Sequence, residues 1–89
     1  GIAVLEGWRV AGVGRALLLT TIAWCRAHQQ IERLTLTCMA GNAAGAGLYE
    51  SVGFRREGRM HNAIRYGNGD YDDILAMAID VRSREQAGG

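Results

Sequence analysis

The stretch Arg9-Val10-Ala11-Gly12-Val13-Gly14-Arg15-Ala16 decides the fold. It follows a short apolar run over 2–5, typical of a buried strand, and leads into residues 16–28, which contain no helix breaker and predict a helix. A glycine-rich loop between a strand and a helix brings unpaired backbone N–H groups and the positive end of the helix dipole together. Gly12 and Gly14 lack a Cβ, so the backbone can approach an anion closely. The loop therefore predicts a phosphate site, with a plain strand-to-helix turn as the alternative.

The helix after this loop carries apolar residues around most of its circumference. On a helical wheel Leu18, Ile22 and Cys25 fall on one side. Leu17 and Trp24 fall on another side. We therefore expect this helix to be covered on more than one side, with Trp24 as a packing group.

The remaining elements are predicted in the order strand, short helix, strand and hairpin strand. Their ranges are 33–39, 43–52, 54–66 and 71–81. Asn42 stands at the N-cap position of the short helix and Gly53 at its C-terminal glycine position. Asn68-Gly69 is a hairpin signal between the last two strands.

The short helix has a weak sequence of its own. Ala44, Leu48 and Val52 recur at four-residue intervals, which is the spacing of an apolar stripe. Gly45 and Gly47 lie inside it, and each costs about 1 kcal/mol relative to Ala. The helix must therefore be held by its surroundings.

This order predicts an α/β fold of the α+β kind, with one mixed sheet. The strand-helix-strand unit favours a parallel strand pair with a right-handed connection, and the hairpin favours an antiparallel pair. The closing strands have no further crossover helix, which argues against a long doubly wound sheet. Residues 1–81 are expected to form the folded part, and residues 82–89, which lack an apolar anchor, a frayed tail.

Composition excludes several classes of protein. The 89 residues, with 48% hydrophobic and 21% charged side chains, have the size and composition of one soluble globular unit or part of one. No apolar run approaches the roughly 18–20 residues that span a bilayer. All ten basic residues are Arg against nine acidic residues, for a net charge of +1, which argues against nucleic-acid binding. A P-loop is excluded because it needs a Lys.

The cysteines and histidines give no metal pattern. Cys25 and Cys38 lie in apolar or alternating stretches and are expected to be buried, reduced thiols, which favours the cytoplasm. His28 and His61 have no ligand spacing, so we predict no metal site. The first residue is Gly1 rather than Met, which suggests that residues upstream are absent.

Three stretches of the sequence carry a family resemblance. They are Arg9-x-x-Gly12-x-Gly14-x-x-Leu17-Leu18, then Asn42-x-x-Gly45-x-x-Leu48-Tyr49-Glu50-x-x-Gly53-Phe54, and then Gly69-x-Tyr71-x-Asp73-x-x-x-Met77. The first looks like the pyrophosphate loop of the GNAT superfamily of acyl-CoA-dependent N-acyltransferases. The second is similar to that family's N-x-x-A-x-x-L-Y-x-x-x-G-F stretch, and the third resembles the closing hairpin of many bacterial members. The chain departs from the pattern with Gly45 for the usual Ala and Val10 for the frequent Gly.

The resemblance implies a role for each motif residue toward acetyl-CoA. The first strand would offer main-chain hydrogen bonds to the pantetheine arm in an opening between it and strand 34–39; the residues concerned are Ile2, Ala3 and Val4. The pyrophosphate would lie on the loop, on the residues Arg9, Val10, Ala11, Gly12, Val13, Gly14 and Arg15. Asn42 would contact the arm, Tyr49 would act as general acid to the CoA thiolate, and Glu6 is the candidate general base.

Each candidate has a structural alternative. Tyr49 may only pack its ring against the sheet, Asn42 may only cap its helix, and Glu6 may lie in a solvated loop. Both tryptophans are expected to be packing groups rather than a substrate platform. Cys38 is not expected to be an acyl-accepting nucleophile, because in the family the amine attacks the thioester directly.

By resemblance, the chain is the C-terminal, CoA-binding portion of a bacterial, cytoplasmic N-acetyltransferase. Acetyl-CoA is the expected donor, and a small amine or a protein N-terminal amine the acceptor. The part of the family's domain that forms the acceptor site is expected to lie upstream of this chain. The alternatives are a CoA- or pyrophosphate-binding module without catalysis, and a structural fragment that completes a partner. The exposed edge of the first strand also predicts a homo-oligomer, or pairing with the missing N-terminal part.

Overall fold

The computed structural model describes residues 1–5 and 14–82. Its elements are β1 (Ile2–Leu5), α1 (Arg15–Ala27), β2 (Arg33–Met39), α2 (Ala43–Ser51), β3 (Arg55–Arg65) and β4 (Tyr71–Asp80). This order confirms the predicted succession of strands and helices. The predicted tail falls almost wholly on residues 83–89, which lie outside the described part of the chain.

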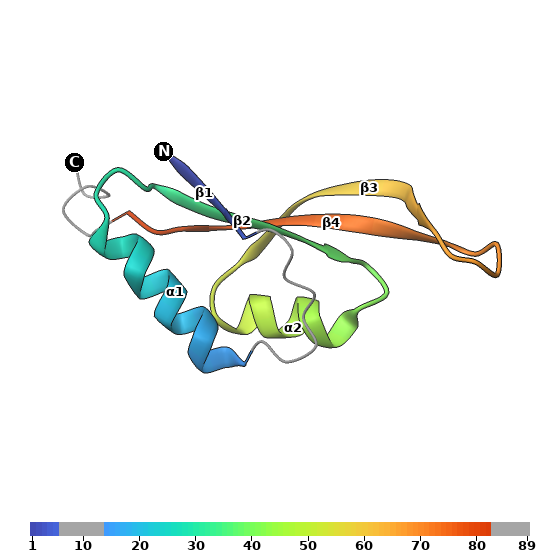
Figure 1. The fold of residues 1–89 in the computed structure, drawn as a ribbon, viewed down its shortest axis with the longest axis horizontal. Coiled ribbons are helices and arrows are strands. Elements are labelled where there is room, and N and C mark those ends of the chain that lie inside the picture. Colours follow the sequence, from blue (N-terminus) through green and yellow to red (C-terminus); the bar gives the residue numbers. More distant parts are fainter. Residues whose placement is uncertain (6–13, 83–89) are drawn as a thin grey trace.

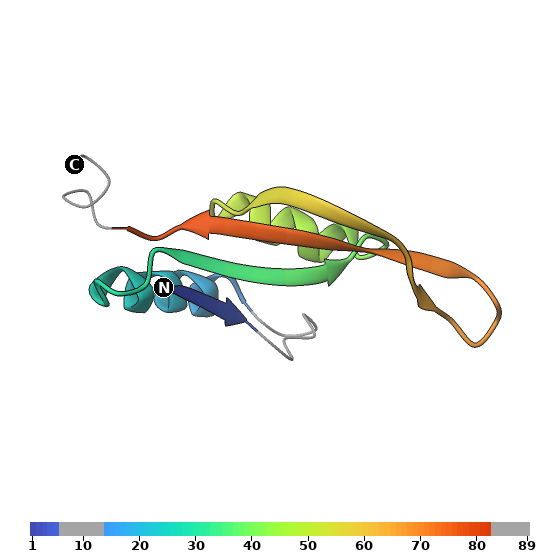
Figure 2. The same ribbon diagram turned by 90° about the horizontal axis from the view of Figure 1, so that it is seen from above.

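The four strands form one mixed sheet in the order β1-β2-β4-β3. β1 pairs with β2 in parallel, and β4 pairs antiparallel with both β2 and β3. These pairings confirm the parallel strand-helix-strand unit and the antiparallel hairpin. In both views the β3–β4 hairpin extends beyond α2 (Figures 1 and 2).

The core lies between the sheet and two helices that cover the same face of it (Figure 1). Alternation along β2 sends Leu34, Leu36 and Cys38 toward the helices, as the sequence predicts, and their partners on β4 are buried with them. The helices add apolar side chains to the same cluster. The buried members on the helices and β4 are Leu18, Ile22, Cys25, Ala46, Tyr49, Leu75, Met77 and Ile79.

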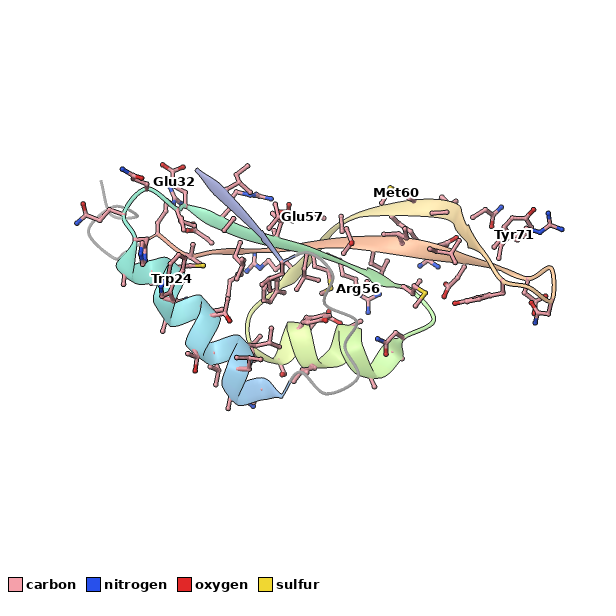
Figure 3. The ribbon with its side chains drawn as sticks, viewed as in Figure 1. Trp24, Glu32, Arg56, Glu57, Met60 and Tyr71 are labelled. Carbon is pink, nitrogen blue, oxygen red and sulfur yellow. The ribbon has the colours of Figure 1, made fainter. Side chains whose placement is uncertain are left out.

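The opposite side of the sheet, here called the open face, carries apolar side chains with no helix over them. Ile2 and Val4 are 64% and 56% exposed, whereas the alternate residues Ala3 and Leu5 pack against the core. Met60 on β3 is also exposed. Figure 3 shows it on the side of the sheet away from the helices.

Helix α1 is buried along one stripe only, which differs from the predicted cover on more than one side. Leu18, Ile22 and Cys25 are buried, but Leu17 is 46% exposed and Trp24 57% exposed. Trp24 stacks on the ring of His28, with ring centroids 3.8 Å apart, instead of packing into the core. A helix that lies on a single sheet face needs one apolar stripe, so the second set of apolar residues faces outward.

Helix α2 also buries a different stripe from the one that its spacing suggested. Its buried residues are Gly45, Ala46 and Tyr49, whereas Ala44 is exposed and Leu48 only half-buried. Ala46 and Tyr49 belong to the core cluster, so this side of the helix faces the sheet. The four-residue repeat of aliphatic residues does not mark the buried side.

The end of α2 is closed by a Schellman motif. The N–H of Gly53 donates to the carbonyl of Glu50 (3.1 Å), and the N–H of Phe54 donates to the carbonyl of Tyr49 (3.0 Å). Gly53 has φ +113°, which confirms its predicted place after the helix. Phe54 is buried, and its ring meets the Tyr49 ring edge to face, with centroids 5.9 Å apart. This is the apolar contact that accompanies such a motif.

We predict that Gly53→Ala lowers the free energy of unfolding by about 1–2 kcal/mol, because Ala is strained at positive φ. In addition, its Cβ would lie 2.9 Å from Cδ1 of Ile79. Urea unfolding of the variant measures this change. Gly67→Ala is the matched control, because a Cβ at that loop position meets nothing within 4 Å. Equal midpoints for the two variants would contradict the role given to Gly53.

Candidate functional site

The predicted site residues fall in three places in the structure and in one segment outside it. Glu6, Arg9, Val10, Ala11, Gly12 and Val13 lie outside the described residues. The others lie on β1 (Ile2, Ala3, Val4), at the start of α1 (Gly14, Arg15), and at the start and on the buried side of α2 (Asn42, Tyr49).

The first turn of α1 is free of its own capping groups within the described part of the chain. Gly14 is the N-cap, in an extended conformation, and no side chain caps the helix or places a carboxylate in its first turn. The carbonyl of Gly14 accepts hydrogen bonds from the N–H groups of Leu17 (3.1 Å) and Leu18 (3.3 Å). A Cβ on Gly14 would meet no atom within 4 Å, so packing among the described residues does not require this glycine. This helix start can accept an anion.

β1 runs alongside β2 over its whole described length. Ile2 pairs with Arg33, and the register continues without a break to Leu5 and Leu36. The opening predicted between these two strands therefore does not fall within Ile2–Leu5. β2 continues for three residues past Leu36, to Met39, and an opening beside this extension stays a prediction.

Asn42 caps α2, as one of its two predicted roles requires. Its Oδ1 accepts a hydrogen bond from the N–H of Gly45 (3.0 Å), while its Nδ2 makes no hydrogen bond with any described residue. A Cβ at position 45 would lie 2.4 Å from Nδ2, so the carboxamide occupies space that only a glycine leaves open. This placement explains why the chain tolerates Gly45 in place of the family's usual Ala.

Tyr49 has a buried ring, and its hydroxyl group has no hydrogen-bond partner among the described residues. The residue is 2% exposed, and its ring is held by the Phe54 contact. Every buried side-chain oxygen or nitrogen among the described residues has a hydrogen-bond partner, so the unpaired Tyr49 hydroxyl must reach solvent. Burial, with a smaller contribution from Cys38, raises the pKa of Tyr49. The phenol therefore keeps its proton at neutral pH.

The two cysteines are buried and free, as predicted. Burial raises the pKa of both thiols, which disfavours the reactive thiolate. The Sγ of Cys38 lies 3.9 Å from the Sδ of Met77 inside the core. Cys38 therefore has the environment of a packing residue and not that of a nucleophile.

The adjacent carboxylates Asp72 and Asp73 of the hairpin have different partners. Asp73 accepts hydrogen bonds from Nε of Arg59 (2.6 Å) and from the N–H of Asn62 (2.7 Å), both within the hairpin. Asp72 also reaches outside the hairpin, to the N–H of Gly41 in the β2–α2 connection. The adjacent acidic pair was the sole sequence signal, and it did not indicate this partner.

A depression of about 720 Å³ lies away from these residues, near the start of β2 and the end of β4. Four arginines and three acidic residues line it, and none belongs to the predicted site. Two of the arginines are already paired, Arg33 with Glu57 and Arg82 with Asp80. We therefore place the candidate site at the helix starts and not in this depression.

The described part of the chain, residues 1–5 and 14–82, carries neither a metal-binding cluster nor a membrane-spanning helix. No group of three or more His, Cys, Asp or Glu side chains in this part of the chain is arranged to hold a metal ion. None of its helices has the length and apolar character to cross a membrane.

The combination of these features defines a class of protein. A parallel strand-helix-strand unit with an uncapped helix start, an Asn-capped helix with a buried Tyr and a closing antiparallel hairpin is the arrangement that the sequence motifs predict for acyl-CoA-dependent acyltransferases. Residues 1–54 match the acetyltransferase (GNAT) family. The chain belongs to this family.

Individual relatives agree with this assignment. The L-amino acid N-acetyltransferase AaaT of Escherichia coli is 35% identical over 79 residues, which cover 88% of this chain and 48% of that protein. The crystal structure of the ribosomal-protein-S18-alanine N-acetyltransferase of Escherichia coli matches with TM-score 0.72 and 31% identity, over 88% of this chain and 49% of that one. A GNAT acetyltransferase from Streptococcus pneumoniae matches with TM-score 0.71 and 30% identity, over 82% and 44%. The chain thus spans about half the length of these relatives.

Proposed function

We propose that this chain is the acetyl-CoA-binding portion of an N-acetyltransferase that acetylates a primary amine. The observation that carries the proposal is the construction of α2. One end of this helix presents the free Nδ2 of Asn42, and its buried side presents the unpaired hydroxyl of Tyr49. Membership of the acetyltransferase family supports a thioester donor for these two groups.

The described residues fit the donor at two of its parts. The uncapped start of α1, at Gly14 and Arg15, suits the pyrophosphate, because backbone N–H groups, the helix dipole and a guanidinium all favour an anion there. Arg9 and the backbone of residues 10–13 would complete this cradle. The Oδ1 of Asn42 already accepts from Gly45, and its Nδ2 donates to no described residue, so Nδ2 is the group we assign to an amide carbonyl of the pantetheine arm.

The proposed chemistry is direct attack by the amine on the acetyl thioester. The nitrogen lone pair forms the new C–N bond as the C–S bond breaks, and the sulfur takes the phenolic proton of Tyr49. The raised pKa of Tyr49 keeps that proton available at neutral pH. The proton lost by the amine goes to a base, for which Glu6 at the end of the first strand is the candidate. The remaining rate acceleration comes from holding the two reactants in the correct relative position.

The activities named for two relatives suggest which acceptor amines to test first. One is an L-amino acid N-acetyltransferase and the other acetylates an alanine of ribosomal protein S18. Amino acid and protein N-terminal α-amines are therefore the first acceptors to test. We also propose a cytoplasmic location, supported by the two free, buried thiols Cys25 and Cys38.

A binding module without catalysis is the second candidate. It is favoured by the chain's span of about half of its relatives' length. Calorimetry with acetyl-CoA and an acetylation screen over amines separate the two functions. Binding without turnover selects the module, and the absence of binding contradicts both. A purely structural fragment would bind nothing.

We predict that Gly14→Val weakens acetyl-CoA binding about tenfold, the equivalent of roughly 1.4 kcal/mol, while the chain stays folded. A Cβ at this position meets no described atom within 4 Å, so the new side chain has room among the described residues and would obstruct a bound anion. Isothermal titration calorimetry measures binding, and urea unfolding measures stability. Gly67→Val, in a loop position that is equally open, is the control. Unchanged binding in Gly14→Val would contradict the anion site.

We predict that Tyr49→Phe leaves acetyl-CoA binding within about twofold and slows acetyl transfer by about 100-fold, a usual loss for a missing general acid. Phe keeps the buried ring and its contact with Phe54, so the variant should fold. Because burial raises the pKa of Tyr49, proton loss from its phenol should not slow wild-type transfer at neutral pH, and the rate should fall only in the alkaline range. Transfer rates across pH test this; a Phe variant as fast as the wild type would remove Tyr49 from the mechanism.

The open face and the free edge of β1 point to a protein partner. The open face carries exposed apolar side chains, and β1 has no strand paired with its outer edge among the described residues. The relatives are about twice as long as this chain. We propose that the polypeptide corresponding to the unmatched half of these relatives covers them.

Mixing the chain with that half of the Escherichia coli amino acid acetyltransferase should give a one-to-one complex by light scattering. Val4→Asp, on the open face, should abolish the complex, whereas Leu17→Asp, on the exposed side of α1, should not. A homodimer that depends on Val4 would instead identify a second copy as the occupant. No association at all would contradict a docking surface.

A further inference from the structure

The carboxylate of Asp72 ties the connection between β2 and α2 to the hairpin. The N–H of Gly41 donates to both of its oxygens, at 3.1 Å and 3.2 Å. The hydroxyl of Tyr66, which follows β3, donates to Oδ2 of the same carboxylate at 2.8 Å. Next to this contact the N–H of Ala40 donates to the carbonyl of Asp73 (2.8 Å). Asp72 is thus the side chain that joins the hairpin to Gly41, 31 residues away in the sequence.

The close approach at Gly41 depends on the absence of a side chain. A Cβ at this position would lie 2.7 Å from Oδ2 of Asp72. The hydrogen bond from Tyr66, with those from the N–H groups of Asp73 and Gly41, holds the pKa of Asp72 below its usual value. At neutral pH the carboxylate is charged, and its hydrogen bonds are of the stronger, charge-assisted kind.

Asn42 follows directly after this fastened residue. Its N–H donates to the carbonyl of Met39 (3.0 Å), and its Oδ1 is held by the N–H of Gly45. The main chain on one side and the helix on the other thus fix where the carboxamide lies. Because Nδ2 is the group left for a ligand, any movement of Gly41 would move that donor.

We propose that Asp72 is a positioning residue that holds the Gly41–Asn42 connection so that Asn42 can meet the thioester donor. The inference rests on the proposed function and adds a link from the hairpin to the donor site. Asp72 touches no substrate; it acts through Gly41. Tyr66 supports it from the hairpin side.

The test is acetyl-CoA binding by calorimetry for Asp72→Ala and Asp73→Asn. The neighbouring Asp73 is a matched control, since its carboxylate is also multiply hydrogen-bonded, but to Arg59 and Asn62 within the hairpin. We expect about tenfold weaker binding for Asp72→Ala and a change within about twofold for Asp73→Asn. Asp72→Asn, which keeps an acceptor oxygen, should restore part of the loss. An equal loss of acetyl-CoA affinity in Asp72→Ala and Asp73→Asn, or no loss in Asp72→Ala, would overturn the proposal.

A double-mutant cycle separates positioning from simple misfolding. Gly41→Ala disrupts the same contact from the other side and should also weaken binding about tenfold. In the Asp72→Ala background, Gly41→Ala should weaken binding little further, because the carboxylate with which its Cβ would clash is absent. Fully additive losses would contradict the link.

Backbone and side-chain amide resonances test the positioning role of Asp72 separately from the proposed acetyl-CoA binding. Asp72→Ala and Tyr66→Phe should shift the Gly41 N–H and the Asn42 side-chain amide, and Asp73→Asn should not. If the wild-type chain does not bind acetyl-CoA, the proposed function fails while these shifts still report whether Asp72 places Asn42. Unmoved Asn42 resonances in Asp72→Ala would refute the positioning role.

Discussion

The contact between the Tyr49 and Phe54 rings is the interaction on which the rest of the structure depends. The last turn of α2 is closed by two backbone hydrogen bonds around Gly53, and the edge-to-face ring pair seals that closure. Because Gly53 has positive φ, the chain can reverse and start β3 directly after the helix. The ring of Tyr49 is thereby fixed in the core, and its hydroxyl is left at the boundary with solvent. The same residues thus fix the chain reversal and orient a potential proton donor.

The structural roles of Asn42 and Tyr49 on α2 are compatible with the chemical roles that we propose for them. The Oδ1 of Asn42 satisfies a backbone donor of the helix, while Nδ2 stays free because Gly45 leaves it room. The capping oxygen of Asn42 and the ring of Tyr49 have partners inside the protein, while one polar group of each has no hydrogen-bond partner among the described residues. The observed cap and ring packing therefore leave the proposed contacts with a ligand possible. A short helix with two internal glycines can hold such groups because neighbouring elements supply the stability that its sequence lacks.

Much of the fold follows from local sequence patterns. The alternation of Leu34, Leu36 and Cys38, the cap at Asn42 and the glycine at Gly53 each specify their element through short-range chemistry. The buried sides of the two helices could not be predicted in this way, because helix orientation depends on packing against the sheet and on how much of α1 the sheet covers. The link from Asp72 to Gly41 depends on strand register across 31 residues, which no local pattern encodes. The pyrophosphate loop over residues 9–13 stays a prediction from its glycines and its place before α1.

We propose that acetyl-CoA lies across the start of α1 and along α2. A crystal structure of the chain with acetyl-CoA bound would locate the donor. We predict the pyrophosphate at the N–H groups that follow Gly14, an arm carbonyl accepting from Nδ2 of Asn42, and the thioester sulfur within hydrogen-bond distance of the Tyr49 hydroxyl. Acetyl-CoA bound at another surface, or with its sulfur remote from Tyr49, would contradict it.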